Sequence, residues 1–224
     1  MEFTPKGLGL EYEDIYFTTQ DNVKLNAWYI PSMKKKGFLL YSHGNGGNIS
    51  HRLEMIKLFY DIGLDVLIYD YRGYGKSRGT PSEKGLYKDI RAAYAYLCAD
   101  KGAEGKKVVL YGESLGGAVS ANLAAQEQVG ALICEGTFTS TKDMAKKVYP
   151  LIPYWLFLTM EFDTLSNMKR VKSPVMIAHS KNDEIVPFEQ GQKLFEAANE
   201  PKELYVMRGG HNEAIFLDTE GFLK

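Results

Sequence analysis

A serine stands between two glycines in the segment YGESLGG (111–117). The apolar run VVLY precedes it and an alanine-rich segment follows it, so the pattern G-x-S-x-G predicts a strand, a sharp turn and a helix. Gly112 and Gly116 suit such a turn, because a side chain at either position would crowd the neighbouring backbone. The alternative is a serine in an ordinary glycine-rich loop. In the first reading, Ser114 rises above the carboxyl end of a sheet, where α/β proteins bind ligands, and is the candidate nucleophile.

A serine hydroxyl needs a base before it becomes a good nucleophile, and the chain contains four histidines. His211 lies in the glycine loop RGGHNEA (208–214), after the last apolar run, and is the candidate base. His43 precedes another glycine loop and is expected to brace it by hydrogen bonding. His51 is expected on the surface of a helix, and His179 in or beside the core.

An acid must orient the imidazole of such a base. Asp183 lies in HSKNDEIVP (179–187), directly after an apolar run, and is the candidate. Glu184 is adjacent and is the rival acid. Asp70, which ends a strand, and Asp163, in an inserted segment, are less favoured.

Acyl transfer also needs N–H donors for the negatively charged oxygen of the tetrahedral intermediate. The backbone N–H of Leu115, directly after the serine, is one candidate donor. The loop HGNGGN (43–48) follows the strand FLLYS, and its glycines free the backbone to present N–H groups. The backbone N–H of Asn45 is the second candidate, completing an oxyanion hole.

These residues require a scaffold, and the hydrophobic pattern predicts one. Alternation over 10–19 and 23–30 indicates two antiparallel strands with one solvent-exposed face. Short apolar runs then alternate with helical patterns, which predicts an α/β fold: a mostly parallel central sheet with helices on both faces. The apolar runs are 37–43, 64–70, 107–112, 131–136, 174–180 and 203–209, and the helical segments include 49–59, 86–97, 115–126 and 188–199.

The segment 137–170 is longer than a simple crossover and carries the aromatic, proline-containing stretch YPLIPYWLFL. It predicts a small helical cap inserted over the end of the sheet, although a single irregular crossover helix is the alternative. Leu151, Trp155 and Phe157 are candidates for the lining of an acyl pocket, or for the core of the cap itself.

Length and composition indicate one domain over residues 1–224, with enough apolar residues for a sizeable core. The net charge of −1 argues against nucleic acid as a partner. No apolar run is long enough to span a membrane, and no signal peptide is visible, so a cytoplasmic location is expected. Cys98 and Cys134 are interpreted as buried thiols. No spacing of histidines, cysteines and carboxylates suggests a metal site. The segment GKS (75–77) lacks the earlier glycine of a phosphate-binding loop, and no cofactor is expected.

Together, HGNGGN, DYRGYGKS, GESLGG, the Asp183 loop and RGGHN resemble the α/β-hydrolase superfamily, and most of all its Bem46-like group. The matched motifs run from about residue 10 to residue 214. The resemblance implies a mostly parallel sheet, with Ser114, Asp183 and His211 as the catalytic triad. It also implies hydrolysis of esters or thioesters, with long-chain acyl groups among the substrates of some relatives.

The function predicted from the sequence is therefore that of a serine hydrolase of the carboxylesterase or acyl thioesterase type, which forms an acyl-enzyme. Its substrate would be a small or lipid-like acyl ester or thioester. The first alternative is hydrolysis of small amides or peptides on the same triad. The second is a non-catalytic binding protein on the same scaffold, although such proteins usually lose a triad residue. The sequence leaves the oligomeric state open.

Overall fold

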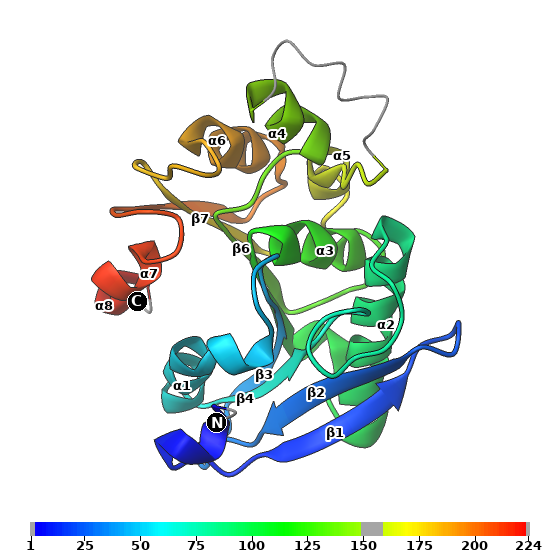
Figure 1. Cartoon of the computed structure of the whole chain (residues 1–224). Coiled ribbons are helices and arrows are strands. Elements are labelled where there is room, and N and C mark those ends of the chain that lie inside the picture. Colours follow the sequence, from blue (N-terminus) through cyan, green and yellow to red (C-terminus); the bar gives the residue numbers. More distant parts are fainter. Residues whose placement is uncertain (1–2, 149–158, 223–224) are drawn as a thin grey trace.

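The structure of the protein is a computed structural model that describes residues 3–148 and 159–222. Within that part, eight strands form one sheet in the order β1-β2-β4-β3-β5-β6-β7-β8 (Figure 1). Strands β3 to β8 run parallel, whereas β1 pairs antiparallel with β2, and β2 with β4. This architecture confirms the predicted fold class. The strands are β1 (Glu13–Thr18), β2 (Lys24–Ile30), β3 (Gly37–Ser42), β4 (Leu64–Tyr69), β5 (Val108–Glu113), β6 (Ala131–Glu135), β7 (Val175–Ser180) and β8 (Lys202–Met207).

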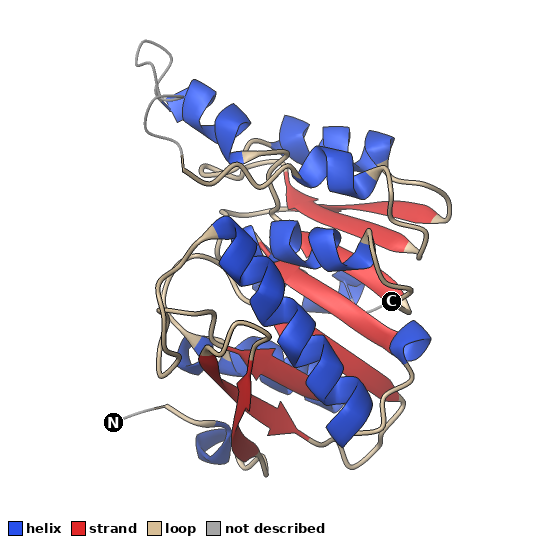
Figure 2. Cartoon of the chain, turned by 90° about the vertical axis from the view of Figure 1, so that its right-hand side faces the viewer, coloured by secondary structure: helices blue, strands red, loops and turns tan. Residues whose placement is uncertain are grey.

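Helices cover both faces of the sheet (Figures 1 and 2). Helices α2, α3, α5 and α6 share one apolar core with the sheet, and α1, α7 and α8 share another on the opposite face. The helices are α1 (Leu53–Asp61), α2 (Glu83–Asp100), α3 (Leu115–Ala124), α4 (Thr141–Val148), α5 (Thr164–Met168), α6 (Phe188–Ala197), α7 (Ala214–Leu217) and α8 (Thr219–Phe222), with 3-10 helices at Pro5–Leu8, Ile49–His51 and Gly105–Lys107.

The near-continuous apolar runs of the sequence are explained by burial on both faces. In β3, Phe38 and Leu40 belong to the core under α2 and α3, while Leu39 and Tyr41 belong to the core under α1. Successive side chains of a strand point to opposite faces, so a strand covered on both sides needs apolar residues at every position. The parallel strands therefore lose the alternation that marks a half-exposed strand.

The sequence predicts one solvent-exposed face for the first two strands, and this prediction is wrong for β2. Residues 25–30 are all buried, including the polar Asn26. The reason is that both faces of β2 are covered, because Ala27 and Tyr29 belong to one apolar core and Trp28 and Ile30 to the other. The Asn26 side chain donates hydrogen bonds to Asp14 Oδ1 (2.6 Å) and to the Ile15 carbonyl (3.1 Å) on β1, which satisfies its amide in the interior.

The predicted cap over 137–170 contains α4 and α5. Both lie at the same end of the molecule as α6 (Figure 1). Its centre, with the predicted acyl-pocket residues Leu151, Trp155 and Phe157, falls outside the described residues. The cap therefore stays a prediction.

Candidate active site

Ser114 occupies a strained turn between β5 and α3. Its φ of 51° and ψ of −110° are unusual for a residue with a side chain and cost about 1–3 kcal/mol. The turn is tight, because a Cβ on Gly116 would overlap the Ser42 carbonyl, and one on Gly112 would overlap the backbone of Gly116. The Ser114 N–H donates to the carbonyl of Glu135 on the neighbouring strand β6 (2.8 Å), which fixes the turn against the sheet.

His211 and Asp183 form a hydrogen-bonded pair in the loops that follow β8 and β7. The Nδ1 atom of His211 lies 2.7 Å from Oδ2 of Asp183. Burial alone would lower the pKa of His211, but the hydrogen bond and negative charge of Asp183 outweigh it and raise the pKa above its ordinary value. Because an ionised carboxylate only accepts hydrogen bonds, Nδ1 carries the proton and Nε2 is left to act as a base.

The carboxylate of Asp183 is itself held by its own loop. Its Oδ1 accepts hydrogen bonds from the N–H groups of Ile185 (2.9 Å) and Val186 (2.7 Å). Burial would raise the pKa of Asp183, but the hydrogen bonds from His211 and from this backbone outweigh burial and lower the pKa. The lowered pKa keeps the carboxylate ionised, and its hydrogen bonds and its 1% exposure fix its orientation.

Glu184, the rival acid, has a different contact. Its Oε2 accepts a hydrogen bond from the backbone N–H of His211 (3.0 Å) and leaves the imidazole to Asp183. Glu184 therefore fixes the histidine loop, while Asp183 fixes the ring. Gly136 supplies the necessary space, because a Cβ there would lie 3.0 Å from Cε1 of His211.

The HGNGGN loop lies beside the serine and is held from three sides. Tyr74 donates to the Asn45 side-chain oxygen (2.6 Å), Tyr71 donates to the His43 carbonyl (2.8 Å), and Arg52 donates to the Gly46 carbonyl (2.9 Å). His43 is fully buried, with Nδ1 2.7 Å from the Gly44 carbonyl, as the bracing hypothesis expects.

The candidate donor Leu115 is the first residue of α3. The N–H groups of a helix's first turn have no acceptor within the helix. Its N–H is therefore available at the same end of the sheet as Asn45, and both residues line a cavity that Ser114 also lines.

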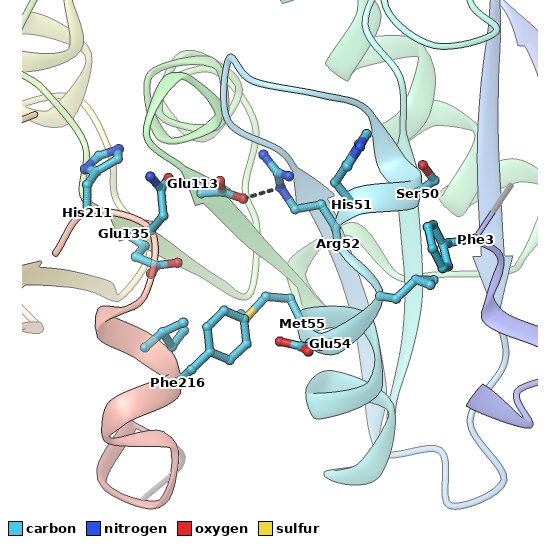
Figure 3. Close-up of a pocket in the computed structure, with 13 residues that line it drawn as sticks. Phe3, Ser50, His51, Arg52, Glu54, Met55, Glu113, Glu135, His211 and Phe216 are labelled. Carbon is cyan, nitrogen blue, oxygen red and sulfur yellow. Dashed lines mark hydrogen bonds and ion pairs between the residues drawn. The ribbon is translucent and has the colours of Figure 1, made fainter. Parts of the chain in front are cut away.

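Three hollows surround the candidate residues. An apolar cavity of about 400 Å³ borders Ser114, Leu115, Phe138, Met144 and Phe162. A polar cavity of about 590 Å³ contains Ser114 together with His211. A third hollow of about 510 Å³ continues from His211 toward α1 (Figure 3). Ser114 thus lies at the junction of an apolar and a polar space.

Three polar residues near the site were not predicted from the sequence to take part in it. His179 is buried, with Nε2 2.9 Å from the Val186 carbonyl and 3.5 Å from Asp183 Oδ2. Glu113 and Glu135 are register partners at the ends of β5 and β6 and border the hollow beside His211. The sequence carries a signal for both glutamates, since Glu113 ends an apolar run just before Ser114 and Glu135 ends one just before Gly136.

His51 is exposed, as expected, but it also borders the polar cavity. Its Nδ1 accepts a hydrogen bond from the Asn48 N–H (3.2 Å). Among residues 3–148 and 159–222, no group of three or more histidine, cysteine, aspartate or glutamate side chains is arranged to hold a metal ion. Within the same residues, no helix has the length and apolar character needed to cross a membrane.

The fold is shared with esterases of known structure. The structure superimposes on the Pyrococcus furiosus esterase Pf2001 with a TM-score of 0.83 at 24% identity, covering 99% of this chain and 92% of that one. An acetyl xylan esterase from Paenibacillus gives a TM-score of 0.77 at 18% identity, covering 94% and 81%. At these identities the likeness concerns the fold.

Sequence relatives place the chain more narrowly. Bem46 of Schizosaccharomyces pombe is 40% identical over 201 residues, which cover 86% of this chain and 67% of Bem46. The uncharacterized protein Rv2307c of Mycobacterium tuberculosis is 36% identical over 208 residues, covering 92% and 74%. The family model described as serine aminopeptidase, S33, matches residues 33–162. The chain therefore belongs to this α/β-hydrolase family, together with Bem46 and its relatives.

Proposed function

We propose that the protein is a serine hydrolase of acyl esters or thioesters, with Ser114 as nucleophile, His211 as general base and Asp183 as the group that orients it. The observation that carries the proposal is the 2.7 Å hydrogen bond between His211 and Asp183, beside a cavity that also contains the strained Ser114. Strain of this kind persists only where the surrounding fold enforces it, and it gathers at functional sites.

The proposed reaction follows from these positions. His211 Nε2 takes the Ser114 proton, the serine oxygen attacks the substrate carbonyl, and Asp183 stabilises the imidazolium that forms. The N–H groups of Asn45 and Leu115 receive the charge that develops on the carbonyl oxygen. The imidazolium then protonates the leaving group, and water releases the acid from the acyl-enzyme by the same steps in reverse order.

The apolar cavity is the proposed acyl site. It touches Ser114 and the two proposed oxyanion donors, and none of its described lining residues is charged. A volume of about 400 Å³ falls in the usual range for small-molecule sites. The residues predicted from the sequence for this role, Leu151, Trp155 and Phe157, lie outside the described part, so Phe138, Met144 and Phe162 take their place in this proposal.

Amide hydrolysis is a second candidate, favoured by the description of the matching family as a serine aminopeptidase. An aminopeptidase substrate carries a free α-ammonium group on its acyl side. The apolar cavity presents no carboxylate to such a group among its described residues, and burying an unpaired ammonium costs several kcal/mol or more. The polarity of the acyl side therefore favours esters and thioesters.

The proposal is tested by hydrolysis of p-nitrophenyl esters from acetyl to palmitoyl, with leucine p-nitroanilide as the amide. We expect ester hydrolysis that Ser114→Ala abolishes, with a chain-length preference set by the apolar cavity. The matched control is Ser120→Ala, the same change at a buried serine within α3, which should keep the activity. Equal activity in the wild type and Ser114→Ala would remove Ser114 from the role of nucleophile, and faster anilide than ester hydrolysis would favour the second candidate.

A further inference from the structure

The two spaces that meet at Ser114 differ in which catalytic group they contain. The apolar cavity borders Ser114, Asn45 and Leu115, but His211 is not among its lining residues. His211 borders the polar cavity and the hollow that continues from it. The two proposed catalytic groups therefore divide the substrate into a part beside the oxyanion donors and a part beside the imidazole.

Proton transfer from His211 determines which part of the substrate occupies each space. When the tetrahedral intermediate collapses, the leaving atom must take a proton from His211 Nε2, so it must lie within hydrogen-bond reach of that atom. The leaving group then extends into the space that His211 borders, and the acyl chain extends into the space that His211 does not border. On this geometry the acyl group is in the apolar cavity and the alcohol or thiol is in the polar one.

The polar cavity and the hollow that continues from it together carry more negative than positive charge among their described lining residues. Glu113 and Arg52 border both spaces, whereas Glu54 and Glu135 border the hollow (Figure 3). Arg52 is already engaged, because its Nε donates to Glu113 Oε2 (2.7 Å) and its Nη2 to a loop carbonyl. The positive charge of Arg52 is therefore balanced by Glu113, and the carboxyl groups of Glu54 and Glu135 give the excess of negative charge.

Glu135 is the most enclosed of these groups. It lies on β6 beside His211, is 6% exposed, and accepts a hydrogen bond from the Tyr111 hydroxyl. Burial raises the pKa of Glu135 to about 7, so it is mainly ionised at pH 8. A buried carboxylate next to the leaving-group space attracts a positive group and repels a negative one.

We propose that the polar cavity and the hollow that continues from it form a leaving-group subsite that selects an alcohol or thiol bearing a positive charge, such as an amino alcohol, over one bearing a negative charge. The inference rests on the proposed function and names its substrate class: an apolar acyl group joined to a cationic leaving group. In the step concerned, the Ser114 Oγ–carbonyl bond forms, the bond from the carbonyl carbon to the leaving oxygen or sulfur breaks, and the Ser114 proton passes through His211 to that atom.

The test uses three thioesters with one acyl group and different charges: butyryl thiocholine (positive), S-butyryl thioglycerol (neutral) and S-butyryl thioglycolate (negative). Values of kcat/KM are measured at pH 8 for the wild type and for two variants, Glu113→Gln and Glu135→Gln. The intrinsic reactivity of each thioester is the same for every variant. The quantity compared between proteins is therefore the ratio of kcat/KM for the positive thioester to kcat/KM for the negative one. We expect at least one variant to lower this ratio by about fivefold to tenfold, the effect of one partly exposed charge pair.

The control is Met144→Ala on the apolar side, which should change the acyl preference and leave the charge ratio unchanged. If the wild type turns over all three thioesters with Ser114-dependent activity but neither glutamate variant changes the ratio, the subsite assignment is wrong while the hydrolase stands. A wild-type preference for thioglycolate over thiocholine, corrected for their rates with hydroxide, overturns it too. If none of the thioesters and none of the p-nitrophenyl esters is hydrolysed, the proposed function itself fails.

Discussion

Two of the aspartate–histidine pairs at the carboxyl end of this sheet, His211–Asp183 and His43–Asp70, differ in distance and in access. His211 and Asp183 are 2.7 Å apart, and His211 borders an open cavity. His43 and Asp70 are 3.5 Å apart, and the His43 side chain has no exposure to solvent. The residue types are the same, and both pairs join loops that follow neighbouring elements of the sheet.

The difference shows what turns such a pair into a candidate catalyst. The Nδ1 atom of His43 contacts the Gly44 carbonyl and its Nε2 faces Asp70, whose Oδ1 accepts the Ile49 N–H (3.0 Å). Both ring nitrogens are enclosed, so this imidazole has no face for a substrate. His211 uses Nδ1 for Asp183, and its Nε2 is the proposed base. We infer that the His43–Asp70 pair holds the proposed oxyanion loop and that the His211–Asp183 pair performs the proposed reaction.

The largest expected effect is the loss of activity in His211→Ala. Without a base, Ser114 is a weak nucleophile, and kcat for a p-nitrophenyl ester should fall by about 10⁴-fold or more. Circular dichroism and thermal melting would show that the variant remains folded. Activity within tenfold of the wild type would mean that the open pair is not the catalytic one.

Asp183→Asn should lower kcat/KM by about 10³-fold to 10⁴-fold, because the asparagine no longer favours the productive tautomer. The pH profile changes in a defined direction. His211 acts as a base only when neutral, so activity rises with pH through its pKa. Asp183 raises that pKa, so its removal should move the acid limb of kcat/KM to lower pH. A limb that stays in place would contradict the assigned role of Asp183.

His43→Ala separates structure from chemistry in the other pair. Removing a fully buried ring and its hydrogen bond should lower the free energy of unfolding by about 2–4 kcal/mol, measured by urea denaturation. The folded fraction should keep activity within about tenfold, since the imidazole touches no substrate in this account. A variant that is fully stable and yet inactive would contradict the structural role of His43.

The smallest effect is expected for Glu184→Gln, the neighbour of Asp183. Glu184 accepts a hydrogen bond from the backbone N–H of His211 and does not contact the imidazole, which is bonded to Asp183, so kcat/KM should fall only a few-fold. The pH limb should keep its position, because the proposed orienting carboxylate is untouched. A loss as large as that of Asp183→Asn would reverse the two roles.

Much of the scaffold could be predicted from the sequence because its signals are local. The apolar runs that became β3, β5, β6 and β7 are mostly buried strands, and the glycines around Ser114 predict a tight turn whatever the rest of the chain does. The order of strands in the sheet is not local. The place of β2 between β1 and β4 cannot be deduced from its own sequence.

The same reason limits prediction of the site. Asp183 and His211 could be selected because each follows an apolar run at the appropriate edge of the sheet. The proximity of Glu135 to His211 depends on how segments from different strands pack together, and that of His179 to Asp183 depends on how the loop after β7 folds back on the end of the strand. The apolar cavity likewise combines Leu86, Phe138 and Val186, which are far apart in the chain and have no common motif.

We propose above that Ser114 is the nucleophile and that the His211–Asp183 pair activates it. The most direct measurement is the mass of the intact protein, and of its peptides, after reaction with diisopropyl fluorophosphate. The account predicts one adduct per chain, located on Ser114, that forms much more slowly in His211→Ala and does not form in Ser114→Ala. An adduct on another residue, or none on the folded wild-type protein, would contradict it.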